Sequence, residues 1–248
     1  MPPPYRGVLF DLFSTLILFE RERLPEMEIG GRRQRTTVAN LGGLLARWAP
    51  GVSREDFLQS ILTVSEEMAR ARRDDLVELP SRERFRRALE RVGCDDDTRD
   101  EAAIHLSRAH MAAIAEATVF PPEHAALLAA LRPRYRIGVV SNFDDTATAY
   151  EILIRHRILA QVDTVVISEA VGLRKPHPAL VRVGLDALGL AAHEVLFVGD
   201  TFSEDVAAAH AAGVDAVWID VRGDGPPETD RPAEYTVRTL PEVAAILA

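Results

Sequence analysis

The sequence predicts an α/β fold in which a doubly wound parallel sheet carries an inserted helical domain. The first observation is a series of short apolar runs that each end at a polar or small residue. The second is that helical patterns alternate with these runs, as in a parallel sheet covered on both faces. The third is that the alternation is interrupted after the first run. Ligands of such sheets bind at the carboxyl ends of the strands, where the polar residues lie.

The core elements follow from continuous apolar runs and from apolar residues at helical spacing. Strands are expected at residues 7–10, 135–140, 164–167, 195–198, 216–219 and 235–237. Helices are expected between them at residues 122–132, 179–188 and 205–212. The segment 222–234 is rich in Gly, Pro and charge, which indicates an exposed loop.

The interruption contains almost no strand-like runs and several helical ones. Helices are expected at residues 37–48, after Ser53, at 81–92 and at 97–116. Ser53 begins a Ser-Arg-Glu-Asp pattern that resembles a capping box. We therefore expect two domains, with the boundaries 1–17 and 118–248 for a core and 18–117 for a helical cap.

Composition and charge exclude several classes of function. The net charge of −9 and the dilution of the basic clusters 32–35 and 82–87 by Glu argue against a nucleic-acid partner. No run of 18 apolar residues occurs, so no membrane partner is expected. The single Cys94 excludes an intrachain disulfide and a CxxC site. Residues 1–7 lack the features of a secretory signal, so a cytoplasmic location is expected.

Asp11, Ser141 and Asn142 follow or end predicted strands. A carboxylate at the position of Asp11 can act as a nucleophile or a metal ligand, and a turn or cap role is equally open for that residue alone. Ser141 and Asn142 could donate hydrogen bonds to an anionic group of a substrate, or they could begin the following turn.

A lysine and two further carboxylates complete the set of candidates. Lys175 is followed by Pro176, which suits the first turn of a helix, and its ammonium could neutralise crowded negative charge. A surface lysine is the ordinary alternative. Asp200 and Asp205 have the spacing of a strand-end loop that enters a helix, and converging carboxylates suit Mg²⁺. Asp205 could instead be an acid favoured by the helix dipole.

Together these stretches resemble the haloacid dehalogenase (HAD) superfamily of hydrolases. The matching stretches, in the family's order, are residues 10–16, 140–142, 174–178 and 198–209. The helical insert is similar to the family's most common cap type. The resemblance therefore covers nearly the whole chain and implies a Rossmann-like core.

The resemblance also implies a role for each matching residue. Asp11 would be the nucleophile that forms a covalent intermediate, and Lys175 would hold its charge. Three residues would bind the transferring group: Ser141, Asn142 and Thr15. Four groups would hold the cofactor Mg²⁺: the carboxylates of Asp11, Asp200 and Asp205 and the backbone carbonyl of Phe13.

Phe13 departs from the family's phosphatases, which carry at this position a second Asp that acts as general acid. A phenyl ring transfers no proton, and such help is typically worth about 10²–10⁴-fold. The family's dehalogenases have an aromatic residue there, because halide leaves without a proton. Those enzymes work without metal and lack the acidic pair that is present here as Asp200 and Asp205. Ser14, next to Phe13, replaces a usual glycine.

Three hypotheses remain open for the function. The leading one is a Mg²⁺-dependent phosphatase that acts on a small phosphorylated metabolite through an aspartyl phosphate, because paired carboxylates beside Asp11 would otherwise repel an anion. The alternatives are a metal-independent 2-haloacid dehalogenase working through an aspartyl ester and a binding protein without turnover. A small molecule is the expected partner, and the chain could be a monomer or a homodimer. Cap residues that could replace the missing acid are Glu20, Glu22 and Arg32 to Arg35, although solvated surface is their ordinary role.

Overall fold

The computed structural model describes residues 5–29 and 31–248. Residues 1–4, part of the segment assessed for a secretory signal, lie outside the described residues. The chain divides into two compact units. One contains the residues up to Leu18 and those from Val119 onward, and the other contains residues Phe19–Thr118.

The first unit is built on a six-stranded parallel sheet with the strand order β10-β9-β8-β1-β6-β7. Its strands are β1 (Gly7–Phe10), β6 (Arg136–Ser141), β7 (Thr164–Ile167), β8 (Val195–Gly199), β9 (Asp215–Ile219) and β10 (Tyr235–Val237). The chain builds outward from β1 through β6 to β7, and then returns to add β8, β9 and β10 on the other side. The carboxyl end of β1 is therefore a topological switch point, where such sheets bind ligands.

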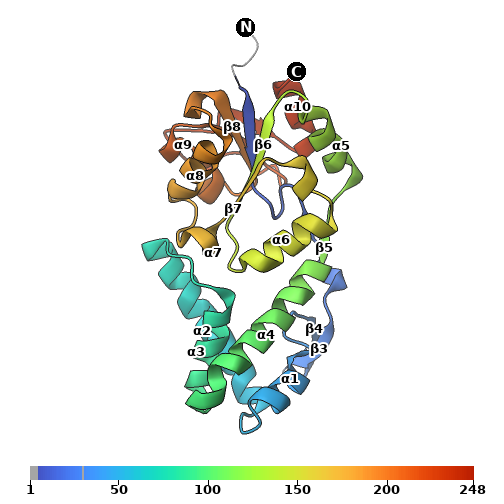
Figure 1. The fold of residues 1–248 in the computed structure, drawn as a ribbon, viewed down its shortest axis with the longest axis vertical. Coiled ribbons are helices and arrows are strands. Elements are labelled where there is room, and N and C mark those ends of the chain that lie inside the picture. Colours follow the sequence, from blue (N-terminus) through green and yellow to red (C-terminus); the bar gives the residue numbers. More distant parts are fainter. Residues whose placement is uncertain (1–4, 30) are drawn as a thin grey trace. The chain divides into compact units, whose positions relative to one another are not determined.

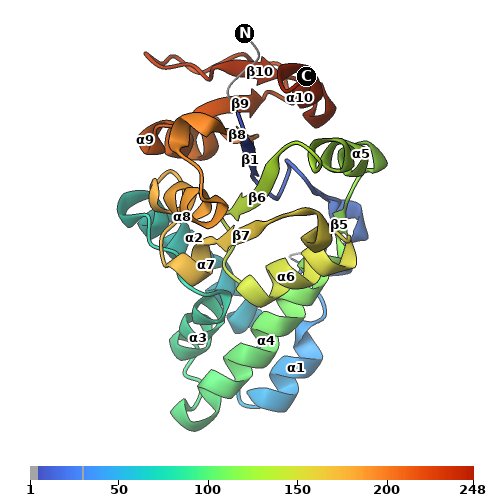
Figure 2. The same cartoon turned by 45° about the horizontal axis from the view of Figure 1, so that its top comes forward.

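Helices cover both faces of this sheet, which confirms the predicted fold class. Figures 1 and 2 show α8 (Ala179–Leu188) and α9 (Ala207–Ala212) on one face and α5 (Pro122–Leu131) and α10 (Val243–Ile246) on the other. Buried side chains such as Leu9, Leu185 and Phe197 join the sheet to α8 and α9. Continuous burial along β1 and β8 explains why these strands read as unbroken apolar runs.

Two parts of the core differ from the expectation or extend it. Pro176, although suited to the first turn of a helix, lies before one, because α8 begins at Ala179 as expected. A proline disfavours helical geometry in the residue before it, so Pro178 keeps His177 out of a helix. The sequence pattern also did not reveal α6 (Thr146–Arg155) and α7 (Ser168–Val171). Residues 222–234 contain no helix or strand, as predicted.

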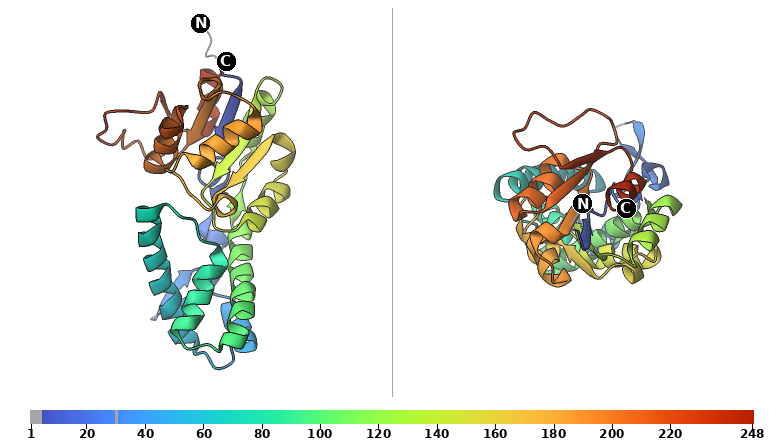
Figure 3. Two further views of the ribbon diagram at one scale, coloured as in Figure 1. Left: turned by 60° about the vertical axis from the view of Figure 1, so that its left-hand side comes forward. Right: turned by 90° about the horizontal axis from the view of Figure 1, so that it is seen from above.

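The second unit is mainly helical, with α1 (Leu41–Trp48), α2 (Arg54–Asp75), α3 (Ser81–Arg91) and α4 (Asp96–Glu116). Helix α3 packs against both α2 and α4, and α1 packs against α4 (Figure 3). Phe57, Phe85 and Leu106 belong to their common core, which also buries Cys94. The Ser53 hydroxyl accepts the Asp56 N–H at 3.4 Å and caps α2, as the sequence pattern indicates.

A β-hairpin in the second unit was not expected. Strand β3 (Glu26–Ile29) pairs with β4 (Arg32–Arg35) in antiparallel register. Every residue of β4 is exposed and polar, so this strand leaves no apolar alternation in the sequence. Strand β3 does alternate, as Glu-Met-Glu-Ile with Met27 buried, but four residues are too few to stand out. The short strands β2 (Leu18–Phe19) and β5 (Thr118–Val119) pair where the chain passes between the units. Within the described part of the chain, no helix combines the length and apolar character needed to cross a bilayer.

Candidate active site

The parallel sheet brings the predicted strand-end residues together. Asp11 follows β1, Ser141 is the last residue of β6, and Asp200 follows β8. Strand β1 lies between β6 and β8, so the three side chains come from the carboxyl ends of adjacent strands in the middle of the sheet. The backbone N–H of Asp11 donates to the Val198 carbonyl at 2.9 Å, which extends the β1–β8 pairing to the candidate nucleophile.

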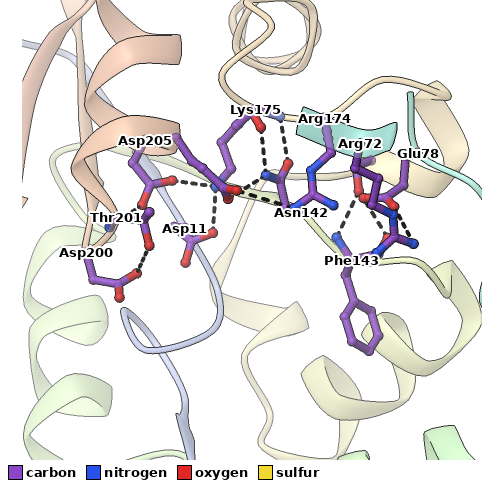
Figure 4. Close-up of polar contacts among 12 residues, drawn as sticks. Asp11, Arg72, Glu78, Asn142, Phe143, Arg174, Lys175, Asp200, Thr201 and Asp205 are labelled. Carbon is purple, nitrogen blue, oxygen red and sulfur yellow. Dashed lines mark hydrogen bonds and ion pairs between the residues drawn. The ribbon is translucent and has the colours of Figure 1, made fainter. Parts of the chain in front are cut away.

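Lys175 lies in the centre of the cluster and is 1% exposed. Its ammonium donates to Asp11 Oδ1 and to Asp205 Oδ1, each at 2.6 Å (Figure 4). It also donates to the Val140 carbonyl at 2.9 Å. An ammonium has three protons, so its hydrogen-bonding capacity is used in full. A buried charge is tolerated only when it is paired, and here two carboxylates share it.

Asp205 is held in place by a π-helical turn, η4 (Phe202–Val206). Its second carboxylate oxygen, Oδ2, accepts the Thr201 N–H at 2.9 Å, so both oxygens are engaged by the protein. Gly199 makes room for this carboxylate, because a Cβ added at that position would lie 2.4 Å from the Asp205 carboxyl carbon. The close approach explains why the strand ends on a glycine.

Asp200 is half-buried and far less engaged. Its Oδ1 accepts the Thr201 hydroxyl at 3.4 Å, and no basic side chain among the described residues pairs with it. Asp11, Asp200 and Asp205 each offer an oxygen within 4.8 Å of the others. When all are ionised, three negative charges face the single positive charge of Lys175. The cluster then carries an excess of two negative charges.

The ionisation of the cluster reflects this excess. Burial raises the pKa of Asp11 to about 7, and the charges of Asp205 and Asp200 act in the same direction against Lys175. Burial and the nearby Asp205 raise the pKa of Asp200 to about 6. Burial by itself would lower the pKa of Lys175, but Asp11 and Asp205 outweigh it and hold the pKa above its ordinary value. A divalent cation would relieve the repulsion.

Two buried hydroxyls, on the turn after Asp11 and at the end of β6, lack partners within the part of the chain that the structure describes. Thr15 and Ser141 are each 1% exposed, and their Oγ atoms have no hydrogen-bond partner among the described residues. A buried hydroxyl without a partner costs about 1–3 kcal/mol, so each of the two suits a polar ligand that would accept its proton. Thr15 belongs to a tight turn in which the Ser14 N–H donates to the Ile17 carbonyl at 2.7 Å.

Comparison with known proteins identifies the family. The family model of the haloacid dehalogenase-like hydrolases matches residues 5–213. The chain belongs to this family. The resemblance inferred from the motifs is therefore confirmed.

Its relatives in the family include both phosphatases and dehalogenases. The phosphoserine phosphatase of Thermus thermophilus is 34% identical over 165 residues, which is 66% of this chain and 64% of that protein. The haloacetate dehalogenase H-2 of Moraxella sp. is 27% identical over 128 residues, 51% of this chain and 56% of that protein. The chain thus matches less than two thirds of the length of either relative.

A solved structure supports the fold over the whole chain. The 2-haloacid dehalogenase of Pseudomonas syringae superposes with a TM-score of 0.73 at 23% identity, and the match covers 98% of each chain. At this identity the similarity shows the fold alone.

Phe13, two residues after the candidate nucleophile Asp11, contributes an aromatic ring. The ring of Phe13 is half-buried and packs against Phe143, with centroids 4.8 Å apart and planes tilted by 32°. Phe143 follows Asn142 directly after β6 and was not recognised from the sequence. The pair forms an apolar surface that neither donates nor accepts a proton.

Asn142, which is expected to bind the substrate, makes hydrogen bonds within the protein through its side chain. Its side-chain amide forms hydrogen bonds with the backbone of Lys175 (Figure 4). The same amide also donates to the Glu204 carboxylate. Glu204 was not among the sequence candidates, and its position next to Asp205 was the one available signal. The suggested replacement acids belong to the other unit, where the Glu20 carboxylate pairs with Arg23.

Proposed function

We propose that this hydrolase is a Mg²⁺-dependent phosphatase of a small phosphorylated metabolite and works through an aspartyl-phosphate intermediate. The observation that carries the proposal is Asp200, a half-buried carboxylate beside Asp11 with no ion-pair partner among the described residues. The relative from Thermus thermophilus, named a phosphoserine phosphatase, supports the same reaction class.

The residues of the cluster suit Mg²⁺, which prefers a few hard oxygen ligands and keeps several waters. Asp11, Asp200 and the backbone carbonyl of Phe13 would hold the ion. Asp205 would contribute its charge, and it differs from the other two carboxylates because both of its oxygens already accept hydrogen bonds. When bound, Mg²⁺ supplies positive charge that offsets the repulsion between the carboxylate of Asp11 and an anionic substrate.

The chain's own groups would carry the reaction. Asp11 Oδ1 is held by Lys175, which leaves Oδ2 to attack phosphorus. The P–O bond to the leaving alcohol breaks as the new bond forms, and water supplies the proton that the leaving oxygen needs. Lys175 stays protonated and stabilises the negative charge of the transferring group. The unpartnered hydroxyls of Thr15 and Ser141 would donate to the phosphoryl oxygens. Water then attacks the aspartyl phosphate, which releases inorganic phosphate and regenerates the carboxylate of Asp11.

We propose that the two units are the two domains expected from the sequence. Residues 1–17 and 118–248 would form the catalytic core, because all the residues of the cluster belong to the first unit. Residues 18–117 would form a cap domain in which substrate selectivity resides. Replacing the cap by that of a relative should change the substrate range and leave the dependence on Asp11 intact.

The test is hydrolysis of p-nitrophenyl phosphate with Mg²⁺ and with EDTA. We expect activity that requires the metal and falls by at least about 10³-fold in Asp11→Asn. Turnover that persists in EDTA or in Asp11→Asn would contradict the proposal. Binding of Mg²⁺ and beryllofluoride at Asp11 would show a working phosphoryl site, and a chain that binds neither would support the binding-protein alternative.

The aromatic pair of Phe13 and Phe143 favours a second candidate, a metal-independent 2-haloacid dehalogenase. In that reaction Asp11 would displace halide and form an ester, and no proton donor would be needed at position 13. The test is chloride release from 2-chloropropionate in EDTA. Asp200→Asn separates the two candidates, because it should abolish Mg²⁺-dependent phosphate release and leave halide release unchanged.

A further inference from the structure

The side-chain amide of Asn142 holds Lys175 by both backbone groups. The Lys175 N–H donates to Asn142 Oδ1 at 2.7 Å, and Asn142 Nδ2 donates to the Lys175 carbonyl at 3.0 Å (Figure 4). One amide thus pairs with one residue as a neighbouring strand would. This use of Asn142 requires an acceptor on one side and a donor on the other.

Glu204 fixes the orientation of that amide. Glu204 Oε2 accepts the second Nδ2 proton of Asn142 at 2.8 Å, and Glu204 Oε1 lies 3.4 Å from the Arg174 guanidinium. If the amide were turned over, its oxygen would face two acceptors, the Glu204 carboxylate and the Lys175 carbonyl. The polarity of Asn142 is therefore set by its surroundings.

Residues of the single turn η4 act on both the backbone and the ammonium of Lys175. Glu204 and Asp205 are neighbours in η4; Asp205 binds the ammonium, and Glu204 acts on the backbone through Asn142. We infer that Asn142 and Glu204 are positioning residues whose hydrogen bonds set where the Lys175 ammonium lies beside Asp11. The inference rests on the proposed function, in which that ammonium stabilises the transferring group.

We call the hydrogen bonds of Asn142 and Glu204 that hold the Lys175 backbone the clamp. The clamp matters because a lysine side chain is long and flexible. Fixing the backbone and the ammonium together limits the rotamers that Lys175 can adopt. A displacement of about 1 Å in a catalytic group can cost on the order of 10²-fold in rate. The clamp should therefore affect the rate of the chemical step more than the binding of substrate.

A swap of hydrogen-bond polarity tests the clamp. Asn142→Asp places an acceptor against two acceptors, so we expect kcat to fall by about 10²-fold with KM changed little. Glu204→Gln can still accept from Asn142 and should stay within about threefold of the parent. In the double variant the amide introduced at position 204 can donate to the carboxylate introduced at position 142. We therefore expect at least roughly tenfold recovery of kcat over Asn142→Asp alone.

The matched control is Glu194→Gln, which makes the same change in a carboxylate that accepts from Ala191 and Arg6. Its kcat should equal that of the parent. If Asn142→Asp is too poorly folded, Glu204→Ala serves in its place, with an expected loss of roughly tenfold in kcat. A rise in KM without recovery in the double variant would show that Asn142 contacts the substrate and would overturn the inference.

Hydrogen exchange at the Lys175 amide separates failure of the clamp from failure of the proposed function. In the parent without added ligand this N–H is bonded to Asn142, so exchange should be slow. Exchange that is at least about tenfold faster in Glu204→Ala, as expected if Glu204 orients Asn142, supports the clamp even in a chain without phosphatase activity. Unchanged exchange overturns it.

Discussion

Asp200 and Asp205 lie on the same strand-end turn, yet they differ in burial and in partners. Asp205 is 2% exposed, and its two oxygens accept hydrogen bonds from the Lys175 ammonium and the Thr201 backbone. Asp200 is half-buried and accepts one long hydrogen bond from the Thr201 hydroxyl. One half of the site is thus completed by the protein. The other half, which includes the unpartnered hydroxyls of Thr15 and Ser141, suits a ligand.

The largest expected effect is that replacing Asp205 or Asp200 by Asn changes the free energy of unfolding in opposite directions. Asn at position 205 offers one acceptor oxygen to two donors, so Asp205→Asn should lower the free energy of unfolding by about 3 kcal/mol. Asp200→Asn removes a charge that is repelled by its neighbours, so it should raise the free energy of unfolding in EDTA by about 1 kcal/mol. Urea denaturation of both variants in EDTA gives the two values. Destabilisation by Asp200→Asn would remove the contrast between the two residues.

Gly199→Ala should disturb the half of the site that the protein completes, because it adds a side chain next to Asp205. The new Cβ would lie 2.4 Å from the Asp205 carboxyl carbon, so the carboxylate must move away from Lys175. We expect a loss of about 2 kcal/mol in unfolding free energy and about 10²-fold in kcat. Gly43→Ala in α1 is the control, because a Cβ there meets nothing within 4 Å. That variant should be neutral or stabilised by up to about 1 kcal/mol through helix propensity.

The half of the site that suits a ligand should make the stability of the protein, and its stabilisation by Mg²⁺, depend on pH. The pKa values of about 7 for Asp11 and about 6 for Asp200 lie above the ordinary value of 3.8, so the folded state binds these protons more tightly than the unfolded state. Without metal, their contribution to stability is greatest below pH 3.8 and is lost as the pH rises toward about 7. Mg²⁺ competes with the same protons, so its stabilising effect should grow as the pH rises from about 5 to 8.

Thermal unfolding with Mg²⁺ and with EDTA across this pH range measures the effect. Asp200→Asn is the control, because it should flatten the dependence of the Mg²⁺-induced shift in Tm. A shift that is constant with pH in the parent would mean that protons and metal do not compete for these carboxylates.

The sequence predicted those features of the site that follow from the topology of the sheet. Asp11 and Ser141 end or follow adjacent strands, so the rule for parallel sheets brings them together without knowledge of any side-chain contact. The contact of Asn142 with Glu204 joins residues that are 62 positions apart. Which amide atom faces which acceptor is decided by packing in three dimensions, and no local pattern encodes it. The hairpin of β3 and β4 went unrecognised because β4 is polar and exposed throughout, and the alternation in β3 spans only four residues.

The smallest expected effect concerns the turn that carries the unpartnered Thr15. Ser14 has φ 63°, in the left-handed region where a side chain costs about 1–2 kcal/mol. Ser14→Gly removes this cost and increases the freedom of the unfolded chain, so the net stabilisation should be about 0.5–1 kcal/mol. Arg157→Gly is the matched control, because Arg157 is also exposed and has φ 57° away from the cluster. Urea denaturation should show a similar gain for both variants. A gain for Arg157→Gly alone would mean that Ser14 makes a stabilising interaction that offsets its backbone conformation, and the turn would then belong to the completed half of the site.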